Sequence, residues 1–173
     1  MDIAFGDDVF NKVHGADWGA KPLAPIFAAH NSLTQDNWAA RFAGFIRITE
    51  PGSYNFGVLH DDGFFFNLYG AGDALASMAN DYLNPPNRKG FATDLMLDVG
   101  LYKFELGAYE RLEAGVVELS WMRNGGSWSR VPTAHLVADG DATPVPEPAS
   151  WALLCVGLAA LSAAGGRRKR ARG

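Results

Sequence analysis

Apolar and polar residues alternate with a period of two along most of the chain between residues 41 and 122. In 54–60, for example, Tyr54, Phe56 and Val58 alternate with Asn55 and Gly57. A period of two in aromatic and β-branched residues predicts half-buried strands. The segments with this alternation are 41–49, 54–60, 64–69, 94–99, 101–109 and 116–122. Alternating strands separated by frequent turns predict an all-β fold, an antiparallel β-sandwich with one buried layer.

The connections between these segments carry turn residues. Segment 50–53, Glu-Pro-Gly-Ser, has Pro and Gly where a type II turn favours them. The sequence Asp61-Asp62-Gly63 also fits a tight turn. We therefore predict an antiparallel meander over 41–69. Segment 73–93 is polar and interrupted by two prolines, and is predicted to be a long surface loop.

Composition limits the classes of function. The chain has 173 residues, of which 48% are hydrophobic, enough for one packed domain with tails. All 19 acidic residues precede Ser150, whereas five of the 15 basic ones lie in 167–172. Residues 1–150 thus hold ten basic and 19 acidic residues, a formal charge of −9, and repulsion from phosphates argues against nucleic acid as a partner. The single cysteine, Cys155, excludes an intramolecular disulfide.

The two ends of the chain differ from its centre. Residues 1–35 give no clear element, and their start lacks the basic and apolar regions of a secretory signal, so we expect a truncated start. Residues 139–148 are a Pro-rich acidic linker, followed by an uncharged apolar segment at 149–166. As a helix, its 18 residues would extend about 27 Å, close to the hydrocarbon thickness of a membrane. The basic tail 167–173 would then remain cytoplasmic.

The order Val-Pro-Glu-Pro-Ala-Ser over 145–150, then an apolar helix, then a basic end resembles the PEP-CTERM sorting signal of exported proteins in Gram-negative bacteria. The resemblance implies recognition near Pro146, Glu147 and Pro148 by an exosortase-type membrane protease, with transient insertion into the inner membrane. The mature protein is then expected at the cell surface or in the extracellular matrix, often with exopolysaccharide and biofilm. A plain single-pass anchor is the alternative.

The centre resembles a second family. Segments 38–46 and 51–56, the Asp61-Asp62-Gly63 turn and the Asp98–Tyr102 strand entry occur in the order typical of the protective-antigen domain (the PA-fourteen family). The similarity covers roughly residues 36–137 and implies a β-sandwich, which we place at 36–138. Such domains occur in adhesins, toxins and glycosidases.

Within that family, the sugar-binding flocculins hold calcium with two aspartates joined by a cis peptide. The resemblance therefore implies that Asp61 and Asp62 bind Ca²⁺, an ion that takes six to eight oxygen ligands. A loop resembling the flocculin one follows 116–122, so Asn124 is expected to complete the metal shell. Vicinal sugar hydroxyls would fill the remaining positions, and Trp128 would stack on a sugar face.

Other interpretations stay open. The Asp-Asp-Gly turn also occurs as a purely structural feature, Asn124-Gly125 favours a tight turn by itself, and Trp128 suits a packed position. The chain is then a ligand-free structural module of the surface or biofilm. No nucleophile or acid–base signature is evident, so we expect a binding protein of extracellular polysaccharide or other glycans and not an enzyme.

Overall fold

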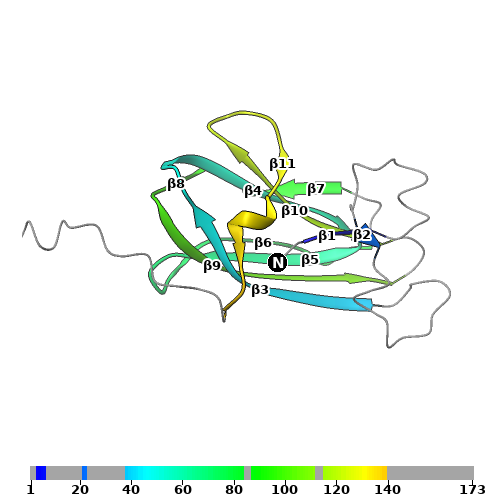
Figure 1. The fold of residues 1–173 in the computed structure, drawn as a ribbon. Helices are drawn as coiled ribbons and strands as arrows, with labels where there is room; N and C mark the ends of the chain where they lie inside the picture. Colours follow the sequence, from blue (N-terminus) through cyan, green and yellow to red (C-terminus); the bar gives the residue numbers. More distant parts are fainter. Residues whose placement is uncertain (1–2, 7–20, 23–37, 84–86, 112–114, 140–173) are drawn as a thin grey trace, which may run out of the picture. The chain divides into compact units, whose positions relative to one another are not determined.

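The protein's structure, a computed structural model, describes residues 3–6, 21–22, 38–83, 87–111 and 115–139. These residues form two β-sheets stacked face to face, with a single 3₁₀ turn at Thr133–His135 (Figure 1). The predicted all-β sandwich is confirmed.

The first sheet, sheet A, has the strand order β2-β1-β10-β4-β7, with β11 also paired to β10 and β8 to β4. Its strands are β1 (Ala4–Gly6), β2 (Lys21–Pro22), β4 (Gly52–Asp61), β7 (Asn87–Gly90), β8 (Leu95–Leu97), β10 (Val116–Arg123) and β11 (Ser129–Arg130). The second sheet, sheet B, has the order β12-β3-β9-β5-β6. Its strands are β3 (Trp38–Ile48), β5 (Gly63–Tyr69), β6 (Ala74–Asn80), β9 (Gly100–Glu110) and β12 (Leu136–Val137).

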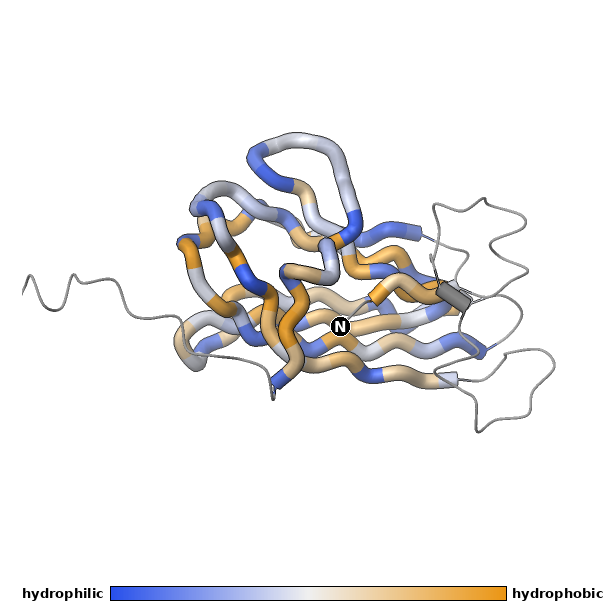
Figure 2. The backbone as a smooth tube through the Cα atoms, in the orientation of Figure 1, coloured by the Kyte–Doolittle hydropathy of each residue, from blue (hydrophilic) through white to orange (hydrophobic). Residues whose placement is uncertain are grey.

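The core lies between the two sheets and is built from the alternating apolar positions of their central strands. Phe56 of β4, Phe66 of β5 and Phe104 of β9 are fully buried and lie in one apolar cluster. Figure 2 shows apolar residues along the strands and polar residues at many of the turns. Each such side chain contributes about 1.5–3 kcal/mol to stability by leaving water. The alternation with a period of two places these side chains on the inner face of each strand.

The predicted meander over 41–69 is wrong. Strand β3 pairs with β9 in sheet B, β4 pairs with β10 in sheet A, and β5 returns to pair with β9 in sheet B. The turns at 50–53 and 61–63 are therefore corners at which the chain passes from one sheet to the other. A short connection is compatible with a hairpin and with a corner, and only the strand partners distinguish them.

Segment 73–93 is also not the predicted loop, because it contains β6 and β7. Each is an edge strand, one on either sheet, and Lys89 Nζ donates a hydrogen bond to the Ala79 carbonyl between them (2.7 Å). An edge strand tolerates polar residues because one of its sides faces solvent. The alternation of apolar and polar residues is therefore weak in 73–93. The sandwich also extends before residue 36, since Ile3 is buried in the core and its carbonyl accepts from Leu119 N (3.0 Å).

Most of the linker and all of the segments predicted at 149–166 and 167–173 lie outside the described residues. Within the described ranges, no helix has the length and apolarity that a membrane crossing requires.

Candidate functional site

The two aspartates lie at the corner where β4 passes into β5. Asp61 is the last residue of β4, Gly63 is the first of β5, and Asp62 stands between the sheets. The peptide bond between Asp61 and Asp62 is cis, the geometry that the flocculin resemblance implied. Asp61 is half-buried and Asp62 is 6% exposed.

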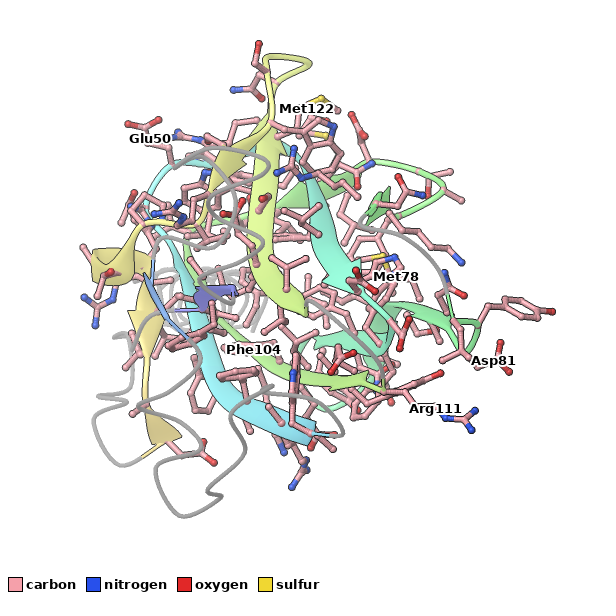
Figure 3. All side chains as sticks on the ribbon, turned by 90° about the vertical axis from the view of Figure 1, so that its right-hand side faces the viewer. Glu50, Met78, Asp81, Phe104, Arg111 and Met122 are labelled. Carbon is pink, nitrogen blue, oxygen red and sulfur yellow. The ribbon has the colours of Figure 1, made fainter. Side chains whose placement is uncertain are left out.

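The end of β9 holds Asp62 in place. Its backbone N–H donates to the Tyr109 carbonyl (2.9 Å), and its carboxylate Oδ2 accepts from the backbone N–H of Arg111 (3.0 Å). The Tyr109 hydroxyl donates to the Asp81 carbonyl (2.8 Å), which brings the end of β6 to the same corner. Figure 3 labels Asp81 and Arg111, which lie near each other at this edge of the molecule. The corner is thus fixed by strands of sheet B on one side and β4 of sheet A on the other.

His60 lies beneath the corner and is fully buried. Its Nδ1 is 2.5 Å from the Asp62 carbonyl oxygen, and its ring centroid is 4.3 Å from that of Phe64. Burial lowers the pKa of His60, because an imidazolium loses its hydration there. The neutral ring then donates from Nδ1 to the Asp62 carbonyl, while Nε2 has no hydrogen-bond partner among the described residues.

The donors at this corner are oxygens, which suits a hard cation such as Ca²⁺. Two consecutive carboxylates supply charge, while the backbone carbonyls of Tyr109 and Asp81 nearby already accept hydrogen bonds. Among the described residues, no group of three or more His, Cys, Asp or Glu side chains is arranged to hold a metal. A bound ion would therefore need carbonyl, water or ligand oxygens besides Asp61 and Asp62.

Asn124 does not belong to this corner, and its predicted role as a third ligand is wrong. Because β10 runs antiparallel to β4, Val116 lies opposite Asp61 and Arg123 lies opposite Tyr54. Asn124 follows Arg123, and its Oδ1 accepts from the Ser53 N–H (3.0 Å) while its own N–H donates to the Ser53 carbonyl (2.8 Å). Eight residues of strand, about 26 Å, separate Ser53 from Asp61. The side chain closes a turn instead, with Asn124 at φ 50°.

Trp128 packs on the outer face of sheet A, over Gly57, four residues before Asp61 on β4. Gly57 of β4 and Gly90 of β7 are paired, and Trp128 covers both. A Cβ at Gly57 would come within 2.9 Å of the Trp128 ring, and one at Gly90 within 3.0 Å. The two glycines leave a flat patch that the indole fills. The packed interpretation of Trp128 therefore fits.

Near Trp128, a buried carboxylate is fully paired. Glu118 on β10 is 2% exposed and accepts from Arg88 Nη2 (3.2 Å), Arg130 Nε (3.3 Å) and Ser120 Oγ (3.0 Å). These bonds tie β7 and β11 to β10. Because its oxygens already have three donors, we assign this cluster to stability.

Sequence reasoning missed Tyr109 and Arg111, the residues that hold Asp62. A usable signal existed in the strand ends. If 116–122 pairs antiparallel with 54–60, the chain just before residue 116 must approach Asp61, and residues 109–111 end the preceding strand. The relevant neighbours of the aspartates therefore precede 116–122, and Asn124 follows it.

Comparison with known proteins identifies the tail and the fold. Residues 144–170 match the PEP-CTERM protein-sorting motif, so the predicted sorting signal is confirmed, and Pro146, Glu147 and Pro148 lie inside the matched range. This motif implies export and membrane-anchored sorting by an exosortase. No curated protein matches the sequence.

Several solved structures share the sandwich. The PA14 domain of the MpAFP antifreeze protein aligns with 20% identity and a TM-score of 0.50, covering 63% of this chain and 55% of that one. The epithelial adhesin 6 A domain of Candida glabrata aligns with 15% identity and a TM-score of 0.51, covering 67% and 58%. An anti-sigma factor domain-containing protein aligns with 18% identity and a TM-score of 0.51, covering 62% and 36%. The chain thus spans less than two thirds of each of these structures, and the likeness establishes a PA14-type fold.

Proposed function

We propose that this exported protein binds carbohydrate at the cell surface or in the extracellular matrix, through a Ca²⁺ ion held at the Asp61–Asp62 corner. One observation carries the proposal: two consecutive aspartates stand at the corner where β4 of sheet A passes into β5 of sheet B, and Asp62 is oriented by backbone groups of Tyr109 and Arg111. Like charges on adjacent residues repel each other, and a divalent cation relieves that repulsion.

Each residue at this corner would have a separate role. Asp61 and Asp62 would hold the ion, and the Arg111 N–H fixes one oxygen of Asp62 so that the remaining oxygen has a defined direction. His60, neutral because of its burial, holds the Asp62 carbonyl from below. When bound, calcium supplies coordination positions that vicinal sugar hydroxyls fill well.

The similar structures support a binding role. The Candida glabrata epithelial adhesin 6 A domain was solved in complex with Galβ1-3GlcNAc, and it shares the sandwich. The sorting motif supports an extracytoplasmic site of action, where glycans and millimolar calcium are both available. We extend the role to adhesion or biofilm matrix as part of the same proposal.

Calorimetric titration of the full-length protein in detergent with CaCl₂ tests the metal site. Asp61→Asn with Asp62→Asn removes both charges yet keeps an acceptor for the Arg111 N–H, so the fold is expected to survive while the calcium heat disappears. Asp73→Asn is the matched control, because Asp73 is an exposed turn residue of the β5–β6 hairpin. A second measurement follows retention on immobilised glycans with calcium and with EDTA. Absence of calcium heat in the wild type, or equal retention in EDTA, contradicts the proposal.

The alternative is a ligand-free structural module, and one observation favours it. The Asp62 N–H and one of its carboxylate oxygens already bond to the end of β9, as they would in a turn that only joins two sheets. In that case the double Asn variant binds no less calcium than the wild type and loses only stability. We propose no catalytic role.

A further inference from the structure

A row of aromatic rings begins beside Asp62 and follows the outer face of sheet B. On this face, Tyr109 of β9 lies opposite Gly63 of β5, and in the next rung Phe65 of β5 lies opposite Gly107 of β9. Each rung thus pairs one ring with one glycine, alternately from the two strands. The row starts at the candidate site, because the Tyr109 carbonyl accepts the Asp62 N–H.

The glycines let both rings lie across the neighbouring strand. A Cβ at Gly107 would stand 2.1 Å from the Phe65 ring, and one at Gly63 would stand 2.2 Å from the Tyr109 ring. The rings therefore cover the backbone of the facing strand and fill the place where a side chain would be. Phe65 nevertheless remains 39% exposed, in contrast to its neighbour Phe66, which is fully buried in the core. One side of the Phe65 ring is presented to solvent.

Polar groups follow the rings along the same strands. Asn67 lies opposite Glu105, which accepts from Arg41 Nη2 (3.1 Å). Beyond them, Lys103 Nζ lies 5.9 Å from the centroid of the Tyr69 ring. From Gly63 to Tyr69 the row extends about 20 Å, longer than a single sugar ring. We call Tyr109, Phe65, Asn67 and Tyr69 the ring strip.

The chemistry of the ring strip suits an extended neutral polysaccharide. A sugar ring has an apolar C–H face, which stacks on a flat aromatic ring, and hydroxyls at its edge, which bond to amide, carboxylate and guanidinium groups. The strip offers both, with the Tyr109 and Phe65 rings first and the polar groups of Asn67 and Glu105 after them. Protein interfaces instead have cores depleted of charge, whereas Arg41, Glu105 and Lys103 lie within or beside this row. The Arg41–Glu105 pair is neutral overall, so the strip does not select a strongly charged polymer.

We propose that the ring strip is a second, extended subsite that binds further residues of the glycan chain whose end is held at Asp61–Asp62. The inference rests on the proposed function for its ligand class and on the continuity of the strip with that corner. Asp61–Asp62 would then set the terminal sugar, and the strip would add affinity in proportion to chain length.

The test compares two glycan lengths on the full-length protein in detergent with calcium. The probes are the methyl glycosides of galactose, mannose and glucose and the corresponding hexasaccharides. The wild type is expected to bind a hexasaccharide more tightly than its monosaccharide. Phe65→Ala should weaken the hexasaccharide about tenfold, the loss expected for one aromatic stacking contact, and leave monosaccharide and calcium affinity unchanged.

Two further variants separate binding from folding. Phe65→Tyr keeps the ring and should restore hexasaccharide affinity. Met96→Ala is the matched control, since Met96 is 80% exposed but lies on β8 opposite Ser53, at the other end of β4. It should change neither affinity.

The outcomes distinguish the two proposals. Calcium-dependent monosaccharide binding without any gain for the hexasaccharide overturns the strip and leaves the proposed function standing. Hexasaccharide binding that depends on Phe65 but not on calcium supports the strip and overturns the metal site. If sedimentation shows a dimer that Phe65→Ala converts to a monomer, the face pairs two copies of the chain and the strip proposal fails.

Discussion

The two ends of β4 look alike in sequence and differ in structure. Both are corners between the sheets, and both place an acidic residue near a glycine, at Glu50–Ser53 and at Asp61–Gly63. At the first corner, the Asn124 side chain and backbone both bond to Ser53, and Trp128 fills a glycine patch over the middle of β4. At the second, two consecutive aspartates follow a buried histidine whose Nδ1 bonds to the Asp62 carbonyl. The first end is organised for packing, and the second is the one at which we propose an ion binds.

The comparison teaches that residue type alone does not assign a residue to a site. Asn124 and Trp128 have side chains suited to metal and sugar, yet the register of β10 on β4 carries Asn124 to the opposite end of β4, and Trp128 packs over Gly57 in the middle of that strand. Arg111 contributes a backbone N–H, a group that every residue except proline has, and it is the one that orients Asp62. The experiments below test whether the two ends of β4 have these different roles.

The largest effect is expected from Trp128→Ala. Removing the indole uncovers Gly57 and Gly90, and the free energy of unfolding should fall by about 2–3 kcal/mol, less than for a fully buried ring because Trp128 is half-buried. Urea denaturation measures the loss, and calorimetry should show unchanged calcium binding. If Trp128→Ala instead keeps its stability and loses glycan retention, Trp128 belongs to the binding site.

A smaller effect is expected from Asn124→Ala, of about 1–2 kcal/mol. The change removes the acceptor for the Ser53 N–H and places alanine at a positive φ. Asn124→Gly relieves the φ cost and should recover part of the loss in the same denaturation assay. Both variants should bind calcium like the wild type. A drop in calcium affinity for Asn124→Gly would mean that the two ends are coupled.

The smallest effect is a pH dependence at the aspartate end. Burial lowers the pKa of His60 in the folded protein below its ordinary value of 6.5. As the pH falls, His60 is therefore protonated in the unfolded chain before it is protonated in the folded one. Stability from this group is complete above about pH 6.5 and falls as the pH drops below it, by at most about 1.4 kcal/mol per pH unit.

Denaturation between pH 7.5 and about 5, in EDTA to remove any bound cation, measures this slope. His60→Leu should flatten the curve, whereas His135→Gln, at the Trp121 ring elsewhere in the sandwich, should leave the contribution of His60 in place. An identical slope in His60→Leu and the wild type would show that His60 is not its source.

The sequence by itself determined the strands and their buried faces. In 54–60, the alternating apolar residues Tyr54, Phe56 and Val58 are all buried, because alternation on a strand is a local property that each segment carries alone. The sorting signal at the C-terminus was equally readable, since its motif, apolar segment and basic end follow one another in the chain. The aspartate pair was found for the same reason.

Only the tertiary structure decided which strands are neighbours and what therefore surrounds Asp61 and Asp62. The turns at 50–53 and 61–63 are short enough for hairpins, but β3, β4 and β5 alternate between the sheets and pair with β9 and β10. These pairings join residues 36 or more positions apart, and the period of two is the same for any partner. The sequence therefore indicates which face of a strand is buried, and the fold determines which ends of the strands meet.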